Sequence, residues 1–219
     1  MAESTPGADP AAWVASLRRT PQQARSRARL ARVLEAAERI LVEEGVESLT
    51  TTRIASEARV SVGSLYQYLP DRGAIIDALA AGYFAKLEAA MDALVEAAAT
   101  EQWEDPVGVL IDAYAEIYRT EHGFRALWFG SGLTERTRAA DREHKRRMAD
   151  GIRRILLALR LAEDDETLAR VCHAAILAAD ALAQEAFRRE TKGDAALLEE
   201  TKILLRGYLT DIAARYNGS

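Results

Sequence analysis

Cysteine, proline and long apolar runs are all scarce in this chain of 219 residues. Cys172 is the only cysteine, so no disulfide can form within the chain, and its apolar surroundings favour a buried, inert thiol over a redox sensor. No stretch is long and uncharged enough to span a membrane, and the N-terminus lacks the charged-then-apolar pattern of a signal peptide. We therefore expect a cytoplasmic protein.

Residue patterns that hold metals or phosphates are also missing from the sequence. None of the three histidines has a histidine or cysteine nearby at metal-ligand spacing, and no GxGxxG or P-loop glycine pattern occurs. We expect no metal, no cofactor and no catalytic residue. An enzyme whose serine, histidine and aspartate come together from distant positions stays open as an alternative, although nothing in the sequence points to one.

The composition instead favours helices. Hydrophobic residues make up 49% of the chain, alanine is abundant, and only five prolines interrupt it. No long run alternates apolar and polar residues as a half-buried strand would. We expect an all-α protein of about nine helices, with enough residues for one or two domains that each have a core.

Charge is unevenly distributed along the chain. The formal net charge is −5, which argues against a protein that coats nucleic acid nonspecifically. Between Arg18 and Arg32, however, there are six arginines and no acidic residue. Such a run would attract DNA phosphates through counterion release, but a solvated and partly disordered arm has the same composition. We expect residues 1–20 to be disordered, and the motif that follows the run favours its role in DNA binding.

Residues 50–70 have the pattern of two short helices separated by a tight turn. Thr50 or Thr51 can cap the first helix and Ser61 the second, because a hydroxyl accepts a backbone N–H that has no partner at a helix start. Pro70 should end the second helix, since the residue before a proline is pushed out of the α region. The polar outer face of that helix suits a DNA major groove. A surface hairpin of helices without a partner would show the same spacing.

Several segments in residues 25–80 support the first interpretation by their order and spacing. They are Arg32-Val-Leu-Glu-Ala-Ala-Glu-Arg-Ile-Leu-Val-Glu-Glu-Gly45, Thr51-Thr-Arg-Ile-Ala55, Val60-Ser-Val-Gly-Ser-Leu-Tyr-Gln-Tyr-Leu69 and Asp71-Arg72. Together they resemble the N-terminal domain of TetR-family transcriptional regulators. The resemblance implies a three-helix helix-turn-helix DNA-binding domain at residues 21–70.

The resemblance also implies which residues contact DNA. In that family the residues that open the second helix touch DNA, the third helix supplies base and phosphate contacts, and a basic residue at the start of the fourth helix binds a phosphate. The matching positions of this chain are Thr51, Arg53, Ser61, Val62, Ser64, Tyr66, Gln67, Tyr68 and Arg72.

Two positions depart from the family pattern. Arg59 occupies the turn position where glycine is usual, and if that position requires a positive φ, arginine there is strained by about 1 kcal/mol or more. Leu69 replaces the usual phenylalanine and should pack similarly. Arg59 therefore leaves open the orientation of the second helix of the helix-turn-helix, the recognition helix that would enter the major groove.

Capping residues and glycines predict the limits of the other helices. Helices should end at Gly45 and near Gly123 and should start after Asp71, Asp105 and Asp194, and one should span residues 134–160. The acidic run at residues 164–166 suits a further helix start, because it faces the positive end of the helix dipole. Residues 71–219 are expected to form an effector-binding and dimerisation domain.

A small-molecule site in this domain is implied by resemblance at the level of architecture. Aromatic residues are close together in its sequence and could line an apolar cavity, with histidine or aspartate orienting the ligand, although each aromatic could equally pack as ordinary core. The candidates are Trp103, Tyr114, Tyr118, Phe124, Trp128, Phe129, His144, His173 and Asp180.

A homodimer is implied as well, because a two-fold dimer brings two recognition helices to successive major grooves about 34–36 Å apart. Small residues on the helix at 171–182 permit close helix approach, and the last helix offers apolar area for a four-helix contact. Both faces could instead be intrachain core. The candidates are Ala174, Ala178, Leu182, Leu204, Leu205, Tyr208 and Ile212.

We therefore expect a ligand-responsive regulator, acting as a repressor, that binds a palindromic operator in double-stranded DNA as a dimer. A small apolar or aromatic effector would release it. The alternatives are an activator, and a helical small-molecule-binding protein or enzyme without sequence-specific DNA binding.

Overall fold

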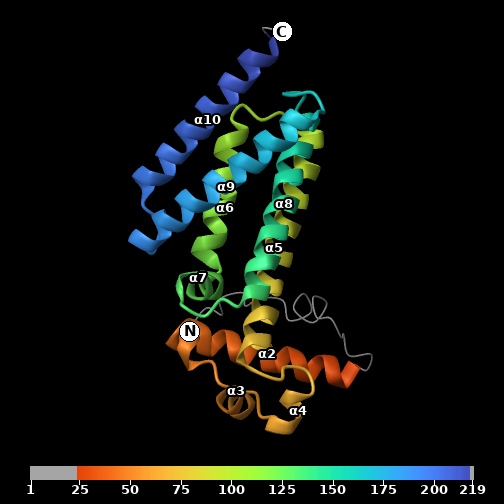
Figure 1. The fold of residues 1–219 in the computed structure, drawn as a ribbon, viewed down its shortest axis with the longest axis vertical. Helices are drawn as coiled ribbons and strands as arrows, with labels where there is room; N and C mark the ends of the chain where they lie inside the picture. The colour runs from red at the N-terminus through yellow and green to blue at the C-terminus, as the bar shows by residue number, and fades with distance from the viewer. Residues whose placement is uncertain (1–23, 218–219) are drawn as a thin grey trace. The chain divides into compact units, whose positions relative to one another are not determined.

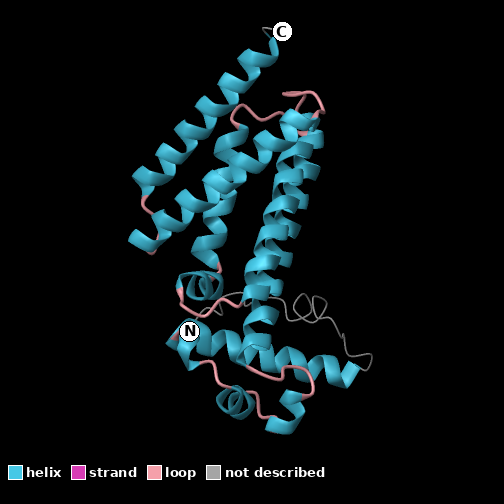
Figure 2. Cartoon of the chain, in the orientation of Figure 1, coloured by secondary structure: helices cyan, strands magenta, loops and turns pink. Residues whose placement is uncertain are grey.

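The computed structural model describes residues 24–217 of the chain, so the expected disordered arm at residues 1–20 lies outside the described residues, as do Arg18 and Arg19. Residues 24–217 form nine α-helices and one short 3-10 helix, and they contain no strand (Figures 1 and 2). The all-α prediction is therefore confirmed. No helix in this part of the chain is long and apolar enough to cross a membrane.

Two compact units make up the described residues, and each unit consists of two separate segments of chain. Residues 24–87 and 121–142 form the first unit, and residues 88–120 and 143–217 form the second. Helices α5 (Arg72–Thr100) and α8 (Glu135–Ala158) each contribute residues to both units. The predicted domain boundary between residues 70 and 71 stays a prediction.

Helix α2 (Ala24–Glu44) carries the first apolar stripe of the first unit. The stripe lies at helical spacing, and each of its residues is at most 2% exposed: Leu30, Val33, Leu34, Ala37 and Leu41. The helix ends where it was predicted to end, because Gly45 has a φ of 82° that glycine adopts without strain. The 3-10 helix η1 (Val46–Ser48) follows.

Helices α3 (Thr51–Glu57) and α4 (Val62–Tyr66) form the helix-turn-helix. Both expected caps are present: the Thr50 hydroxyl accepts the Arg53 N–H at 3.3 Å, and the Ser61 hydroxyl accepts the Ser64 N–H at 3.2 Å. Arg59 has a φ of 53° in the turn, so the condition under which arginine is strained there is met.

Helix α4 is shorter than predicted. It ends at Tyr66, whereas Pro70 was expected to end it. The Leu65 carbonyl accepts both the Tyr68 N–H at 3.0 Å and the Leu69 N–H at 2.9 Å, which closes a turn in place of another helical turn. Leu69 is buried there, as expected for a residue that replaces phenylalanine.

Helices α6 (Pro106–Thr120) and α7 (His122–Phe129) correct the prediction that a helix ends near Gly123. Helix α6 ends three residues earlier, and Gly123 lies inside α7. Glycine is needed there for space: a Cβ atom at position 123 would lie 1.9 Å from the Tyr83 hydroxyl of α5. Both residues belong to the first unit.

Helices α9 (Glu166–Arg189) and α10 (Ala195–Asn217) pack against each other and against α6 in the second unit. The cap predicted at Asp194 is present, and the acidic run at residues 164–166 supplies a second cap. Asp165 accepts the Leu168 N–H at 2.7 Å, and Asp194 accepts the Leu197 N–H at 3.1 Å.

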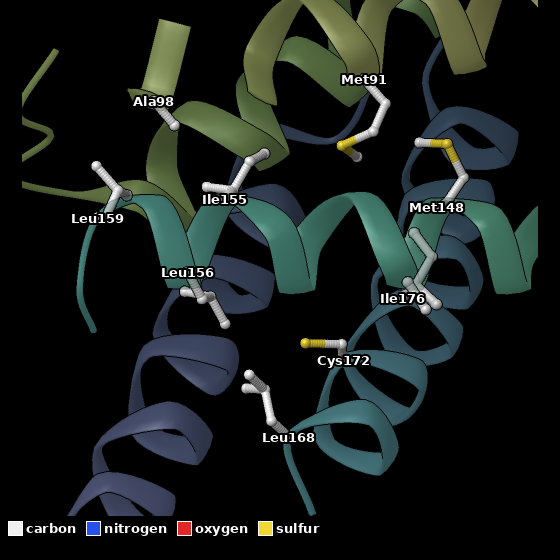
Figure 3. Packing of buried hydrophobic residues seen from close by; sticks show 10 residues of the cluster. Met91, Ala98, Met148, Ile155, Leu156, Leu159, Leu168, Cys172 and Ile176 are labelled. Carbon is white, nitrogen blue, oxygen red and sulfur yellow. The ribbon is translucent and has the colours of Figure 1, made fainter. Parts of the chain in front are cut away.

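The core of the second unit is an apolar cluster from α5, α8 and α9 (Figure 3). Met91 packs so closely on Gly151 that a Cβ atom there would lie 2.3 Å from the Met91 Cγ. Cys172 is in the same cluster and is only 1% exposed, and its burial raises the pKa of the thiol to about 11. The expectation of a buried cysteine is confirmed.

Candidate functional site

Helix α4 buries one side and exposes the other. Leu65 is buried, whereas Ser61 and Gln67 are exposed and Tyr66 is 48% exposed, an unusual degree for a large aromatic side chain. The remaining candidates on or beside this helix are half-buried: Val62, Ser64 and Tyr68. The predicted DNA-contacting residues of α4 are thus available to a partner.

Two hydroxyl contacts fix the orientation of this surface. The Thr51 hydroxyl lies 3.1 Å from the Tyr66 hydroxyl, which connects the first residue of α3 to the last residue of α4. The Ser61 and Ser64 hydroxyls are 2.8 Å apart. Four of the predicted DNA-contacting residues are therefore held in two hydroxyl pairs before DNA binds.

The two arginine candidates already have partners within the chain. Arg53 forms an ion pair with Glu44. Arg72 donates to the Val46 carbonyl at 2.8 Å and lies 3.0 Å from a Glu47 carboxylate oxygen. The pKa of Glu47 is lowered, first by a hydrogen bond from Ser131 and then by Arg72. Exposed ion pairs are weak, so either arginine could exchange its carboxylate for a phosphate at small cost.

In the second unit, a polar cluster surrounds Asp180, which is 6% exposed. Its carboxylate accepts the Tyr114 hydroxyl at 2.7 Å and the Gln184 amide at 2.8 Å, and it lies 2.8 Å from the Lys145 ammonium. Burial, together with the neighbouring Tyr118 and Asp180, raises the pKa of Tyr114 well above its usual value. The buried carboxylate of Asp180 is thus paired with the Lys145 ammonium and lies beside aromatic rings.

The six aromatic candidates divide between the two units. Tyr114 and Tyr118 belong to the second unit, where Tyr118 stacks on Phe187 with ring centroids 4.9 Å apart. Trp103 packs on the apolar cluster of Figure 3. In the first unit, Phe124 stacks on Trp128 at 4.5 Å, and Phe129 follows on the same helix. These residues therefore do not all line one site within a single unit.

The two histidine candidates have different surroundings. His144 is 4% exposed, and its Nδ1 lies 2.9 Å from a Glu88 carboxylate oxygen. His173 lines a groove of about 540 Å³ between α8 and α9, with apolar residues that include Ala174 and Leu177. His173 thus lies at a groove on the surface of the second unit, whereas His144 is buried.

The dimerisation candidates are only partly exposed. Ala174 of α9 and Leu204 of α10 are exposed, whereas Leu205 is buried in a cluster with Val107 and Ile111. The others are half-buried: Ala178, Leu182, Tyr208 and Ile212. Sequence reasoning missed the exposed Leu177 and Ile203, although Leu177 is one helical turn from Ala174 and Ile203 adjoins Leu204.

A capped helix-turn-helix with an exposed second helix, joined to a helical unit without strands in residues 24–217, defines a regulator of the helix-turn-helix class. Comparison with known protein families identifies the family within this class. The family described as bacterial regulatory proteins, tetR family, matches residues 33–79, and the tetracyclin repressor-like C-terminal domain matches residues 101–213. The chain belongs to the TetR family of transcriptional regulators, which are not enzymes.

One solved structure supports the same family, and two more distant ones share the fold. A TetR-family transcriptional regulator from Streptomyces coelicolor is 30% identical, with a TM-score of 0.63, 84% of this chain covered and 98% of the other. A protein of Mesorhizobium loti MAFF303099 assigned to the TetR family is 12% identical, with a TM-score of 0.65 and 86% and 98% covered. The SmeT–triclosan complex is 18% identical, with a TM-score of 0.52 and 81% and 90% covered. A search of curated proteins found no match.

Proposed function

We propose that this regulator is a repressor that binds a palindromic operator as a homodimer and leaves it when a small apolar or aromatic effector binds. The observation that carries the proposal is the outer surface of α4, where Ser61, Tyr66 and Gln67 are exposed beside a hydrogen-bonded Thr51. Hydroxyl and amide groups on a short exposed helix suit base edges and phosphates in a major groove.

The DNA-contacting residues are those of the predicted set. Gln67 and Val62 contact base edges, because an amide can bond adenine in two places and an apolar side chain can pack on a thymine methyl. Tyr66, Thr51 and the two serines contact phosphates. Arg53 and Arg72 exchange their carboxylate partners for phosphates when DNA arrives.

The dimer forms through the exposed faces of α9 and α10. Large apolar side chains are exposed on both helices, with Leu177 at 45% and Ile203 and Leu204 at 52% each. Ala174 lies one turn from Leu177 and permits close helix approach. A two-fold contact between these faces buries the apolar area that a single chain leaves in water.

The effector binds in the second unit. Tyr114 and Asp180 offer a polar anchor beside the rings of Tyr118 and Phe187. The related SmeT structure is a complex with triclosan. An effector that favours the state unable to bind DNA, by about 1–3 kcal/mol, weakens operator binding five- to 150-fold.

Selection of bound duplexes from random DNA tests the operator. We expect one palindromic sequence to be enriched, with half-site centres one helical turn apart or a multiple of it. Absence of any enriched sequence at moderate ionic strength would overturn the proposal. Operator affinity is then measured with and without aromatic compounds that raise the melting temperature of the protein. An unchanged affinity with a compound confirmed to be bound would refute release by an effector.

Sedimentation of a double variant tests the dimer. We expect Ile203→Glu with Leu204→Glu to give a folded monomer with weakened operator binding. Leu161→Glu is the matched control, because Leu161 is 55% exposed and belongs to neither helix of the proposed contact. A double variant that stays dimeric would exclude these faces from the interface.

A further inference from the structure

Helix α2 begins with a group of arginines that the fold does not use. Arg25, Arg27, Arg29 and Arg32 occur in its first nine residues, and the first acidic residue of the helix is Glu35. The first turn contains no acidic residue either. Cations in the first turn of a helix are disfavoured, because the N-terminal end of the helix dipole is positive. The two arginines of the first turn, Arg25 and Arg27, are therefore unfavourably placed for the stability of α2.

None of these four arginines forms an ion pair or a side-chain hydrogen bond with a residue in the described range 24–217. Other arginines of the first unit do form such pairs: Arg39 with Glu57, Arg53 with Glu44, and Arg72 with Glu47. The formal net charge of the chain is −5, so acidic partners are not scarce. Basic side chains without an acidic partner among residues 24–217 are free to attract an anionic partner such as DNA.

Three of the four arginines share one side of the helix. Arg25, Arg29 and Arg32 follow each other at spacings of four and three, so their side chains leave α2 along one strip. Arg39 continues the strip seven residues after Arg32, and its guanidinium lies 3.1 Å from Glu57, the last residue of α3. Arg39 therefore connects the C-terminal end of this strip to α3, the first helix of the helix-turn-helix.

Arg27 lies elsewhere on the helix. It is two residues from Arg25, which places it about 200° around the helix axis from that residue. It is exposed and has the same charge and nearly the same distance from the helix start. Arg27 is thus a natural control for any effect that depends on charge alone.

We propose that Arg25, Arg29 and Arg32 bind backbone phosphates of the operator outside the base pairs that α4 reads. This inference rests on the proposed DNA binding and extends its footprint along the duplex. Guanidinium groups match phosphate oxygens in a bidentate geometry, and the strip has no aromatic residue that could stack on a base. Contacts to phosphates add affinity and salt dependence but carry no base preference.

The test compares the full chain with the triple variant Arg25→Gln, Arg29→Gln and Arg32→Gln, and with Arg27→Gln. Binding to the selected operator with ten flanking base pairs on each side is measured from 50 to 200 mM salt. Three lost phosphate contacts lower the slope of log affinity against log salt by about 2.7. The wild type then loses about 40-fold more affinity than the triple variant over that range. We expect Arg27→Gln to leave the slope close to that of the wild type.

Two further readouts make the inference specific. Trimming the flanking base pairs should weaken the wild type and leave the triple variant unaffected. The triple variant should enrich the same operator sequence as the wild type. Its melting temperature should stay equal or rise by about 1–3 °C, because positive charge is removed from the start of α2.

Several results would overturn the inference. One is a triple variant with the slope of the wild type, and another is a control variant that lowers the slope as much per residue as the triple variant does. A changed operator preference in the triple variant would also overturn it, since that result assigns the arginines to bases. These failures differ from failure of the proposed function, in which the wild type itself enriches no duplex.

Discussion

Substitution of Gly123 by alanine is the perturbation whose effect follows most directly from the geometry. Gly123 of α7 faces Tyr83 of α5, whose hydroxyl donates a hydrogen bond to a Glu38 carboxylate oxygen of α2 at 3.0 Å. A Cβ atom at position 123 would lie 1.9 Å from that hydroxyl oxygen and 3.0 Å from the ring carbon that bears it. Tyr83 is 1% exposed, so its ring cannot swing into solvent.

The expected loss of stability is the sum of three effects. Overpacking of a core contact costs about 1–3 kcal/mol. Displacement of the hydroxyl also breaks its hydrogen bond to a carboxylate, which costs about 1.5–3 kcal/mol. Alanine is a better helix former than glycine by about 1 kcal/mol, which offsets part of the cost. We therefore expect Gly123→Ala to lower the free energy of unfolding by about 1.5–5 kcal/mol.

Urea unfolding followed by circular dichroism measures this loss, and a double-mutant cycle with Tyr83→Phe tests its cause. Phenylalanine removes the oxygen that the new methyl group would strike, so the double variant should be more stable than the sum of the two single effects by about 1–2 kcal/mol. Effects that add within about 0.5 kcal/mol would show that the methyl group and the hydroxyl do not meet, and would refute the reasoning.

Variants at three further positions test other features of the fold. Burial raises the pKa of the Glu38 carboxyl, so the folded protein favours its protonated form. The contribution of Glu38 to the stability of the fold is therefore complete below the ordinary carboxyl pKa and is lost as the pH rises through the raised pKa. Glu38→Gln should therefore gain melting temperature relative to the wild type between pH 4 and 7, and a constant difference would contradict this. Arg59→Gly should raise the free energy of unfolding by about 1 kcal/mol in urea, because glycine adopts the φ of 53° without strain, whereas Arg59→Val should lower it. Gly151→Ala should cost about 1–3 kcal/mol in the same assay, since its methyl group would lie 2.3 Å from the Met91 Cγ, and an unchanged midpoint would exclude that contact.

Local rules were sufficient for most of the fold. Capping depends on residues within one turn of each helix start, so the sequence predicted the caps at Ser61 and Asp194 and left the first cap between Thr50 and Thr51. The positive φ of Gly45 is also a local feature, because it depends on the glycine itself at the end of α2. These features require no knowledge of what packs against them.

Features that depend on distant residues were out of reach. Gly123 looked like a helix end, yet it is a point of close approach to Tyr83, which lies forty residues earlier and on another helix. The ion pair of Arg72 with Glu47 and the polar cluster at Asp180 also bring together residues that are far apart in the sequence. Proximity in sequence also grouped aromatic residues such as Tyr118 and Phe124, which the fold assigns to different compact units. The spacing of residues within one helix does not show which other helices pack against it.

The central claim is that α4 reads base pairs, and selection with an altered α4 tests it most directly. The wild type and a variant with Val62→Ala and Gln67→Ala are each used to select duplexes from the same random pool. We expect both proteins to enrich palindromes of equal spacing that differ in base identity at the positions facing these two side chains. The same operator enriched by both proteins, with equal affinity, would show that these residues of α4 do not read the DNA.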